Sequence, residues 1–281
     1  MTALSERIAE ALSHIRAEKP LIHHITNLVV MNDTANVTLH VGALPVMAHA
    51  VEEVVEMTSV AGALVLNLGT LTPTSVESMR TAGRKANERS IPIVLDPVGA
   101  GASRLRTQTA VRLLDELKIA VVRGNTGEIG ALSGTGGVVK GVESMEGVRD
   151  PAAVTMGFAR GRDIVVAMSG KRDFVSDGWR LLGVDNGHVW LTTLTGTGCM
   201  ATTVIAAFAA VERDPLVAAA GGLACFGLTA ELAAKKAAGP ASFKVALFDQ
   251  LYNLTPEQLA SGARIVELES GQAGEQIHER R

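Results

Sequence analysis

The sequence has little of the material on which several classes of protein depend. Two cysteines, Cys199 and Cys225, are too few for a disulfide framework, so we expect a reducing, cytoplasmic setting. Aromatic residues make up 3% of the chain, which disfavours a surface that stacks nucleic-acid bases. The net charge of −3 provides no excess of Lys and Arg to neutralise nucleic-acid phosphates. A nucleic-acid partner is therefore not expected.

No stretch of the sequence is predicted to cross a membrane. The mean hydropathy is +0.24, and the most apolar stretches are residues 201–211 and 216–234. Both are rich in Ala, Gly and Thr, and the second contains Glu231, so we expect a closely packed pair of buried helices. Apolar residues at helical spacing, interrupted by charges, predict an amphipathic helix over residues 4–15 rather than an export signal.

The rest of the composition is typical of a globular protein with a large core. Of the 281 residues, 47% are hydrophobic and 20% are charged. Short aliphatic runs alternate with helical patterns, which predicts a single α/β domain over residues 1–281 with a parallel sheet. The strands are expected at 44–47, 63–68, 91–95, 119–122, 164–168 and 189–194. The helices are expected at 51–60, 73–90, 106–117, 151–161, 197–211 and 216–237. A surface loop is expected at 134–141 and a frayed tail after Glu269.

Several polar residues directly follow the expected strands. In an open parallel sheet, the loops and helix N-termini at the carboxyl ends of the strands meet at one edge, where ligands bind. The strongest signal there is TGTGCM at 195–200, between an expected strand and an expected helix. Its glycines allow backbone amides to turn inward, and the first turn of a helix leaves N–H groups unpaired. Gly196 and Gly198 therefore suit an anion such as a phosphate, although a tight structural turn fits the spacing equally well.

Cys199 lies in the first turn of the helix expected at 197–211. A helix N-terminus stabilises a thiolate, so we expect the pKa of this thiol to be lowered. In this interpretation Cys199 is a base or a hydrogen-bond acceptor for a substrate hydroxyl. The alternative is a small buried residue, which is what we expect for Cys225 in the middle of an apolar helix.

Two further strand ends carry charge. Asp96 follows the strand at 91–95 and suits either Mg²⁺ or the capping of the next turn. Beyond the strand at 119–122, Arg123 is placed to pair with phosphate oxygens, and Asn125 to cap a helix. Glu128 suits either a metal or the positive end of that helix. Together with the glycine loop, these residues favour nucleotide and metal chemistry.

The early part of the chain holds a third cluster. His23 and His24 point in opposite directions on an extended chain, so a shared metal is not expected. His49 shows none of the spacings of a metal motif. Met47 either lines an apolar pocket or packs in the core.

Taken together, these segments resemble the hydroxyethylthiazole kinases of the ribokinase-like superfamily. The matching motifs are HHITN (23–27), PVMAHAVEEV (45–54), LVLNLGTL (64–71), DPVGAGASRLRT (96–107), RGNTGEI (123–129), TGTGCM (195–200) and GPASF (239–243). The resemblance implies a ribokinase-like fold, with a central, mostly parallel sheet flanked by helices on both faces. It also implies that ATP, with Mg²⁺, phosphorylates the primary hydroxyl of 4-methyl-5-(2-hydroxyethyl)thiazole in thiamine salvage.

The resemblance also assigns roles to residues of this chain. Those assigned to the substrate are Thr26, Asn27, Met47 and Gly196. Those assigned to ATP are Arg123, Asn125 and Ser169. Those assigned to the metal are Asp96 and Glu128, and those assigned to catalysis are Cys199, Gly196 and Gly198. The family is typically a homotrimer with active sites between subunits, which implies that Thr26 and Asn27 complete a neighbour's pocket.

Two other functions remain open at this point. One is a related kinase that acts on another small alcohol, such as a hydroxymethylpyrimidine. The other is a nucleotide-binding protein without catalysis, although the intact Asp96, Glu128 and Cys199 disfavour it. Because phosphoryl transfer through a loose transition state needs only a weak base, we hypothesise that Cys199 assists catalysis without dominating it.

Overall fold

A nine-stranded sheet, in the order β11-β10-β9-β8-β5-β4-β3-β1-β2, forms the centre of the computed structural model. The structure describes residues 3–135, 138–140, 143–146 and 148–268. The parallel strands are β1 (Leu21–Ile25), β2 (Leu44–Val46), β3 (Ala63–Asn67), β4 (Ile93–Asp96), β5 (Val121–Asn125) and β8 (Val165–Ser169). The antiparallel continuation consists of β9 (Asp173–Ser176), β10 (Leu181–Val184) and β11 (Ile265–Glu267). A separate hairpin pairs β6 (Val138–Lys140) with β7 (Glu143–Glu146).

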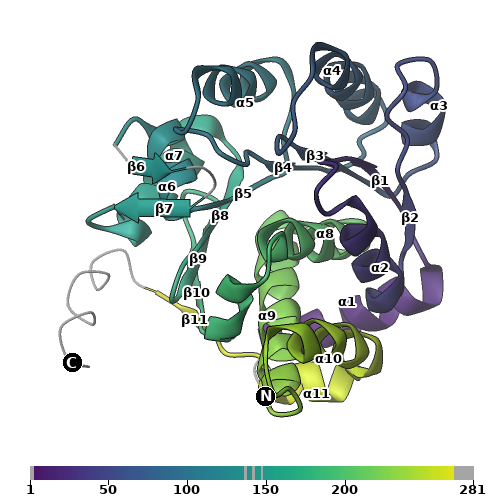
Figure 1. Cartoon of the computed structure of the whole chain (residues 1–281), viewed down its shortest axis with the longest axis vertical. Helices are drawn as coiled ribbons and strands as arrows, with labels where there is room; N and C mark the ends of the chain where they lie inside the picture. The colour runs from purple at the N-terminus through teal and green to yellow at the C-terminus, as the bar shows by residue number, and fades with distance from the viewer. Residues whose placement is uncertain (1–2, 136–137, 141–142, 147, 269–281) are drawn as a thin grey trace.

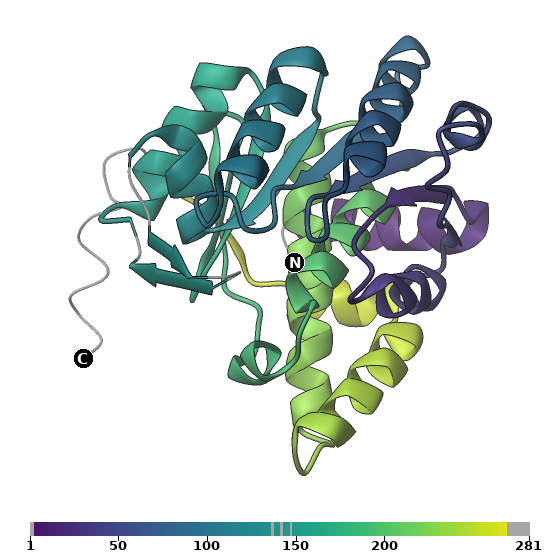
Figure 2. The same cartoon turned by 45° about the horizontal axis from the view of Figure 1, so that its top comes forward.

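Helices cover both faces of this sheet (Figures 1 and 2). The face toward the top and left of Figure 1 carries α3 (Val54–Ser59), α4 (Pro73–Glu88), α5 (Arg104–Glu116), α6 (Thr126–Ser133) and α7 (Pro151–Arg162). The opposite face carries α1 (Ala3–Glu18), α2 (Met31–Val41), α8 (Thr197–Ala209), α9 (Pro215–Ala234), α10 (Pro240–Asn253) and α11 (Pro256–Gly262). Each central strand therefore contributes to two cores, as in β4, where Val94 faces one core and Ile93 and Leu95 face the other. The expected α/β fold with helices on both faces is confirmed.

The two apolar helices α8 and α9 pack directly against each other, as the sequence predicts. A Cβ on Gly222 would come within 2.7 Å of Ile205 Cα, so the absence of a side chain there permits the close approach. In the described part of the chain, α9 is the one helix long and apolar enough to cross a bilayer, and 89% of its most apolar window is buried inside the protein. Its apolar character is accounted for by its position in the core.

The segment expected as a strand at 189–194 is instead the 3-10 helix η1 (Val189–Thr193), so this prediction is wrong. Val, Trp and Thr are typical of a strand, but here the hydroxyls of Thr192 and Thr193 donate to carbonyls three residues earlier. The strands β10 and β11 occupy that end of the sheet. The glycine loop therefore follows a helical turn rather than a strand.

Other elements were not predicted from the sequence. These are strands β1, β7, β9, β10 and β11 and helices α2, α10 and α11. The loop expected at 134–141 is wrong for Val138–Lys140, which pair with β7. The tail after residue 269 lies outside the described residues.

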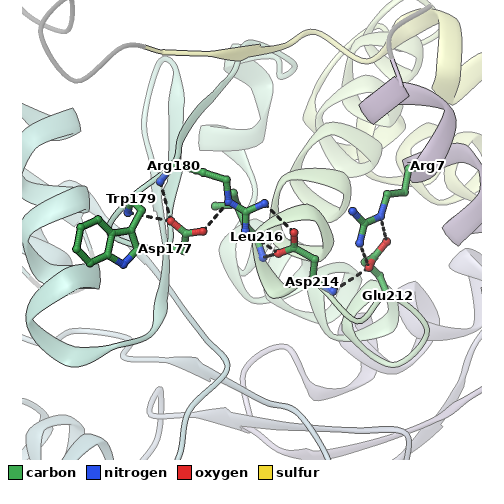
Figure 3. A network of polar contacts seen from close by, with 7 residues as sticks. All are labelled: Arg7, Asp177, Trp179, Arg180, Glu212, Asp214 and Leu216. Atoms are coloured by element: carbon green, nitrogen blue, oxygen red, sulfur yellow. Dashed lines mark hydrogen bonds and ion pairs between the residues drawn. The ribbon is translucent and has the colours of Figure 1, made fainter.

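A chain of ion pairs joins the β9–β10 turn to the beginning of α9 and to α1 (Figure 3). Arg180 Nε donates to Asp177 Oδ2 within the turn at 2.7 Å. Arg180 Nη1 donates to Oδ2 of Asp214, at the start of α9, at 2.8 Å. Asp214 also caps α9, because its carboxylate accepts from Leu216 N. Arg7 on α1 completes the chain through Glu212, at 2.7 Å between Nε and Oε2. These contacts fasten the antiparallel end of the sheet to the helical layer.

The Glu116 carboxylate on α5 gives a test of the surface electrostatics. It accepts from Arg80, Arg84 and Arg112, and the hydrogen bond from Arg80 is the main reason that its pKa falls to about 2. Because the folded protein favours the charged form, the stabilisation exists above the ordinary pKa of 4.5 and is lost as pH falls toward 2. In urea unfolding, Glu116→Gln should be less stable than the native protein at pH 7, with a smaller difference at pH 3.5.

The matched control is Glu88→Gln, which removes one exposed ion pair with Lys85. Its effect should be smaller at every pH, since isolated exposed pairs contribute little. Added salt should reduce the Glu116 effect. An equal loss of stability from Glu116→Gln at pH 3.5 and pH 7 would contradict the assignment.

Candidate active site

Three parallel strands end beside the N-terminus of α8, at the carboxyl edge of the sheet. Asn67 ends β3 and lies directly opposite Asp96, which ends β4. Asn27 follows β1, and Cys199 lies in the first turn of α8. All four residues are buried. The predicted meeting of polar residues at this edge is confirmed for Asp96 and Cys199, whereas Asn27, which the resemblance assigned to a neighbour's pocket, contacts Cys199 of its own chain.

Asn67 connects the members of this cluster. Its Nδ2 donates to Asp96 Oδ2 at 2.7 Å and to Cys199 Sγ at 3.1 Å. Its Oδ1 accepts from Asn27 Nδ2 at 2.9 Å and from Gly69 N at 3.0 Å. An amide has donors only on nitrogen and acceptors only on oxygen, so these four bonds permit one orientation. Sequence reasoning missed Asn67 because it placed the residue inside an apolar strand at 63–68.

The environment of Cys199 keeps its thiol protonated. Burial raises the pKa of Cys199 to about 12, and the negative charge of Asp96 adds to the effect. Donation from Asn67 and Asn27 to the sulfur, the latter at 3.4 Å, opposes this shift but does not overcome it. The expected lowering of the thiol pKa by the helix N-terminus is therefore wrong, because desolvation of the charged form outweighs it.

The glycine loop has the backbone geometry of an anion site. Gly196 is the N-cap of α8 with φ +82°, a conformation that favours glycine, and a Cβ there would overlap Val30 Cγ1. Met200 N bonds back to Gly196 O, and the three amides before it lie in the first turn, where a helix provides no acceptor. A Cβ on Gly198 would overlap the Arg123 guanidinium. The loop therefore brings unpaired amides and a positive charge together.

Arg123 and Ser169 line a cavity next to this loop, and Nη2 of Arg123 donates to Ser169 Oγ at 2.7 Å. Arg123 Nε is buried and has no hydrogen-bond partner among the described residues. The cavity has a volume of about 580 Å³, and α9 adds an apolar wall with Leu223 and Phe226. A cavity with positive charge, free amides and an apolar wall suits a nucleotide.

Asp173 is a further lining residue that the sequence did not single out. It lies at the start of β9, where Gly170 N donates to its Oδ1 at 2.9 Å. Burial raises the pKa of this carboxyl to about 6. By contrast, Asn125 caps α6 by accepting from Glu128 N, as one of its alternatives predicted, and does not line the described cavity. Its role in binding ATP stays a prediction.

Asp96 and Glu128 are two buried carboxyl groups near Arg123. Burial raises the pKa of Asp96, while the positive charge of Arg123 opposes the rise. The pKa of Glu128 rises to about 7, first through burial and then through the charge of Asp96. Its two oxygens each accept a backbone N–H, from Gly99 and Asn125, at 2.8 Å. In the part of the chain that the structure describes, no group of three or more His, Cys, Asp or Glu side chains could hold a metal.

Comparison with known proteins decides the family. The profile of the hydroxyethylthiazole kinase family matches residues 12–257. The chain belongs to the hydroxyethylthiazole kinase family. It is 69% identical to hydroxyethylthiazole kinase from Roseiflexus sp. (strain RS-1), over 95% of this chain and 99% of that protein. It is 65% identical to the enzyme of the same name from Desulforudis audaxviator (strain MP104C), over 95% of this chain and 98% of that protein.

Superposition on solved structures gives the same family. The hydroxyethylthiazole kinase protein from Pyrococcus horikoshii OT3 superposes with a TM-score of 0.86 at 43% identity, covering 94% of this chain and 99% of that one. The pyridoxal kinase from Staphylococcus aureus in complex with pyridoxal reaches a TM-score of 0.62 at 15% identity, covering 89% of this chain and 98% of that one. The second match shows a shared fold alone, and together they confirm the predicted ribokinase-like architecture.

The side chains of His23 and His24 join β1 to neighbouring helices and to the segment after β2. His23 lies 2.8 Å from Ala48 O and 2.9 Å from Thr58 Oγ1, whereas His24 lies 3.2 Å from Thr38 Oγ1 on the helix α2. They therefore face opposite sides of β1, as predicted. Burial lowers the pKa of His24 to about 3, which keeps its ring neutral. His49 contacts both Thr26 and Met47.

Replacing Gly196 tests the backbone of the anion loop. Gly196→Ala forces a side chain into the left-handed region and against Val30, which should destabilise the protein by about 3 kcal/mol. Urea unfolding measures the change. In the background Val30→Ala the same substitution should cost less, because the overlap is removed while the backbone strain remains.

Gly157→Ala in α7 is the matched control, since the space around Gly157 is open. It should leave stability unchanged or raise it by up to about 1 kcal/mol. An equally small effect of Gly196→Ala would show that the loop does not require glycine.

Proposed function

We propose that the protein transfers the γ-phosphoryl group of ATP to the primary hydroxyl of 4-methyl-5-(2-hydroxyethyl)thiazole. The products are the thiazole phosphate and ADP, and the reaction belongs to thiamine salvage in the cytoplasm. The observation that carries the proposal is the meeting of the α8 amides, the Arg123 guanidinium and the Asn27–Asn67–Asp96–Cys199 cluster at one edge of the sheet. Membership of the hydroxyethylthiazole kinase family supports the choice of substrate.

The side chains that bind ATP in this proposal line the 580 Å³ cavity. Arg123 and Ser169 contact the phosphates, while Leu223 and Phe226 contact the base. The amides of residues 197–199 receive charge on the γ-phosphoryl oxygens. Phosphoryl transfer needs alignment and charge stabilisation more than covalent help, and a half-buried guanidinium beside free amides provides both.

The acceptor alcohol lies between Met47, Thr26, Asn27 and Gly196 in this proposal. Cys199 presents a neutral thiol to the hydroxyl group of the alcohol, because its raised pKa excludes a thiolate in the free protein. The thiol orients the hydroxyl, and its sulfur accepts a hydrogen bond as it does from Asn67. A loose transition state makes this sufficient, since the hydroxyl proton leaves late and passes to an oxygen of the transferred phosphoryl group.

Asp96 and Glu128 fit a magnesium ion that takes most of its ligands from elsewhere. Two carboxylates without a third acidic neighbour in the described chain cannot form a full protein cage. Mg²⁺ usually keeps several waters and binds one or two carboxylates together with substrate phosphates. When bound, the ion supplies neutralisation of phosphate charge. Asp96 and Glu128 would hold it directly or through water.

A homotrimer with active sites between subunits completes the proposal. Leu28 and Val29 follow Asn27 directly, and their side chains are 74% and 66% exposed. Exposed aliphatic side chains at the border of a site are typical of a surface that another subunit covers. Thr26 and Asn27 would then stand at the junction of two protomers.

The reaction is tested by ADP release with purified protein, ATP and the thiazole alcohol, with and without Mg²⁺. Turnover should require both the alcohol and the ion. A hydroxymethylpyrimidine is the competing substrate, and faster turnover with it would favour the related kinase. ATP binding without turnover of either alcohol would show a nucleotide-binding protein and overturn the proposal.

Gly198→Ala should weaken ATP binding specifically. The added Cβ displaces the Arg123 guanidinium, while the backbone of Gly198 is not in the left-handed region. We expect the KM for ATP to rise about tenfold, which corresponds to about 1.4 kcal/mol, with the KM for the alcohol within about twofold. Steady-state kinetics measure both. Gly157→Ala should change neither, and an equal rise in both constants would contradict the assignment of Arg123.

Leu28→Asp should dissociate the assembly and reduce turnover, because a buried charge at a subunit interface is unpaired. Native mass spectrometry gives the oligomeric state. Trp179→Asp is the control, since Trp179 is 77% exposed on the β9–β10 turn at the other end of the sheet. A native protein that is a monomer with full activity would exclude the trimer.

A further inference from the structure

His49 joins the two segments to which the acceptor alcohol is assigned. Its Nδ1 lies 3.1 Å from Met47 O, and its Nε2 lies 3.1 Å from Thr26 N. The contact with Met47 is local, whereas the contact with Thr26 spans 23 residues and links the end of β2 to the end of β1. This histidine has no part in the phosphoryl-transfer steps described above.

The partners of His49 determine which nitrogen carries the proton. A carbonyl oxygen only accepts, so Nδ1 donates its hydrogen to Met47 O. The amide of Thr26 only donates, so Nε2 offers its lone pair. Nε2 is also 3.1 Å from Thr26 O, but the opposite tautomer would leave both the Thr26 amide and Nδ1 without these bonds. The tautomer with the proton on Nδ1 therefore makes both contacts at once.

The sheet itself does not hold the segment after β2 beside the site. The pairing of β1 with β2 ends at His23 and Val46, and β2 is an edge strand. Beyond it, Ala48 O lies 2.8 Å from His23 Nε2, and His49 O accepts from Ser78 Oγ on α4 at 2.7 Å. These contacts fasten the segment to the body of the protein.

The imidazole of His49 ties this segment to the reacting groups. Thr26 precedes Asn27, whose Nδ2 donates to Cys199 Sγ at 3.4 Å. A continuous path of contacts thus runs from Met47 through His49, Thr26 and Asn27 to Cys199. The ring of His49 is the middle link of this path.

We infer that His49 is a positioning residue for the acceptor alcohol. The imidazole fixes the position of Met47 relative to Asn27 and Cys199. In the proposed complex Met47 contacts the thiazole ring, and Asn27 and Cys199 contact the hydroxyl group of the alcohol. The inference rests on the proposed function. Because the path does not pass through the nucleotide cavity, its effect falls on the alcohol and not on ATP.

Steady-state kinetics of three variants test the inference. His49→Ala removes both bonds and should raise the KM for the thiazole alcohol about tenfold, with the KM for ATP within about twofold. His49→Asn retains a donor near the place of Nδ1, and His49→Gln retains an acceptor near the place of Nε2. Each should recover part of the lost affinity, which a general loss of folding would not produce.

His14→Ala is the matched control, because His14 is an exposed histidine on α1 and should leave both constants unchanged. If His49→Ala does not fold, the Asn and Gln variants carry the test. An unchanged KM for the alcohol, or equal rises for alcohol and ATP, would overturn the inference. Turnover of the thiazole alcohol by the native protein is measured first. An inactive native protein refutes the proposed function itself, whereas an active one leaves the variants to test the role of His49.

Discussion

The buried amide of Asn67 is the contact on which the arrangement of the site depends. It bonds to groups from three other segments, and its two ends are chemically different, so it fixes Asp96, Cys199 and Asn27 together. A buried polar group without a partner is costly, and this network satisfies its members among themselves. The cluster is therefore rigid before any ligand arrives.

The same burial governs the ionisation of the site. Two carboxyl groups, Asp96 and Glu128, are withdrawn from water near a single guanidinium, and the pKa of each is raised. The thiol of Cys199 is affected in the same direction. In the proposed reaction, ATP and a magnesium ion would bring further charges to this edge, where the ionisation of these groups would respond to them. Arg123 is the positive group that all these charges share.

Much of the fold could be predicted from the sequence because its signals are local. Aliphatic runs mark β3, β4, β5 and β8, and helical periodicity marks α4, α5 and α7. The strand β1 was missed because two histidines interrupt its apolar pattern, although both side chains are buried among partners from other elements. Residues 189–193 show the opposite error, in which a strand-like composition forms a 3-10 turn, and the hydroxyls of Thr192 and Thr193 bond to carbonyls of the same turn. The motifs that identify the family come from these local segments.

By itself the sequence determined the central parallel strands β3, β4, β5 and β8 with the helices between them, the glycine loop before α8 and the chemical types of residue at the strand ends. These depend on short stretches of chain, within which periodicity and the conformational freedom of glycine act directly. Only the tertiary structure decided that Cys199 stays protonated, that Asn67 joins the cluster and that His49 bridges Thr26 and Met47. Desolvation and hydrogen bonding depend on neighbours that are distant along the chain, and folding alone brings those neighbours together.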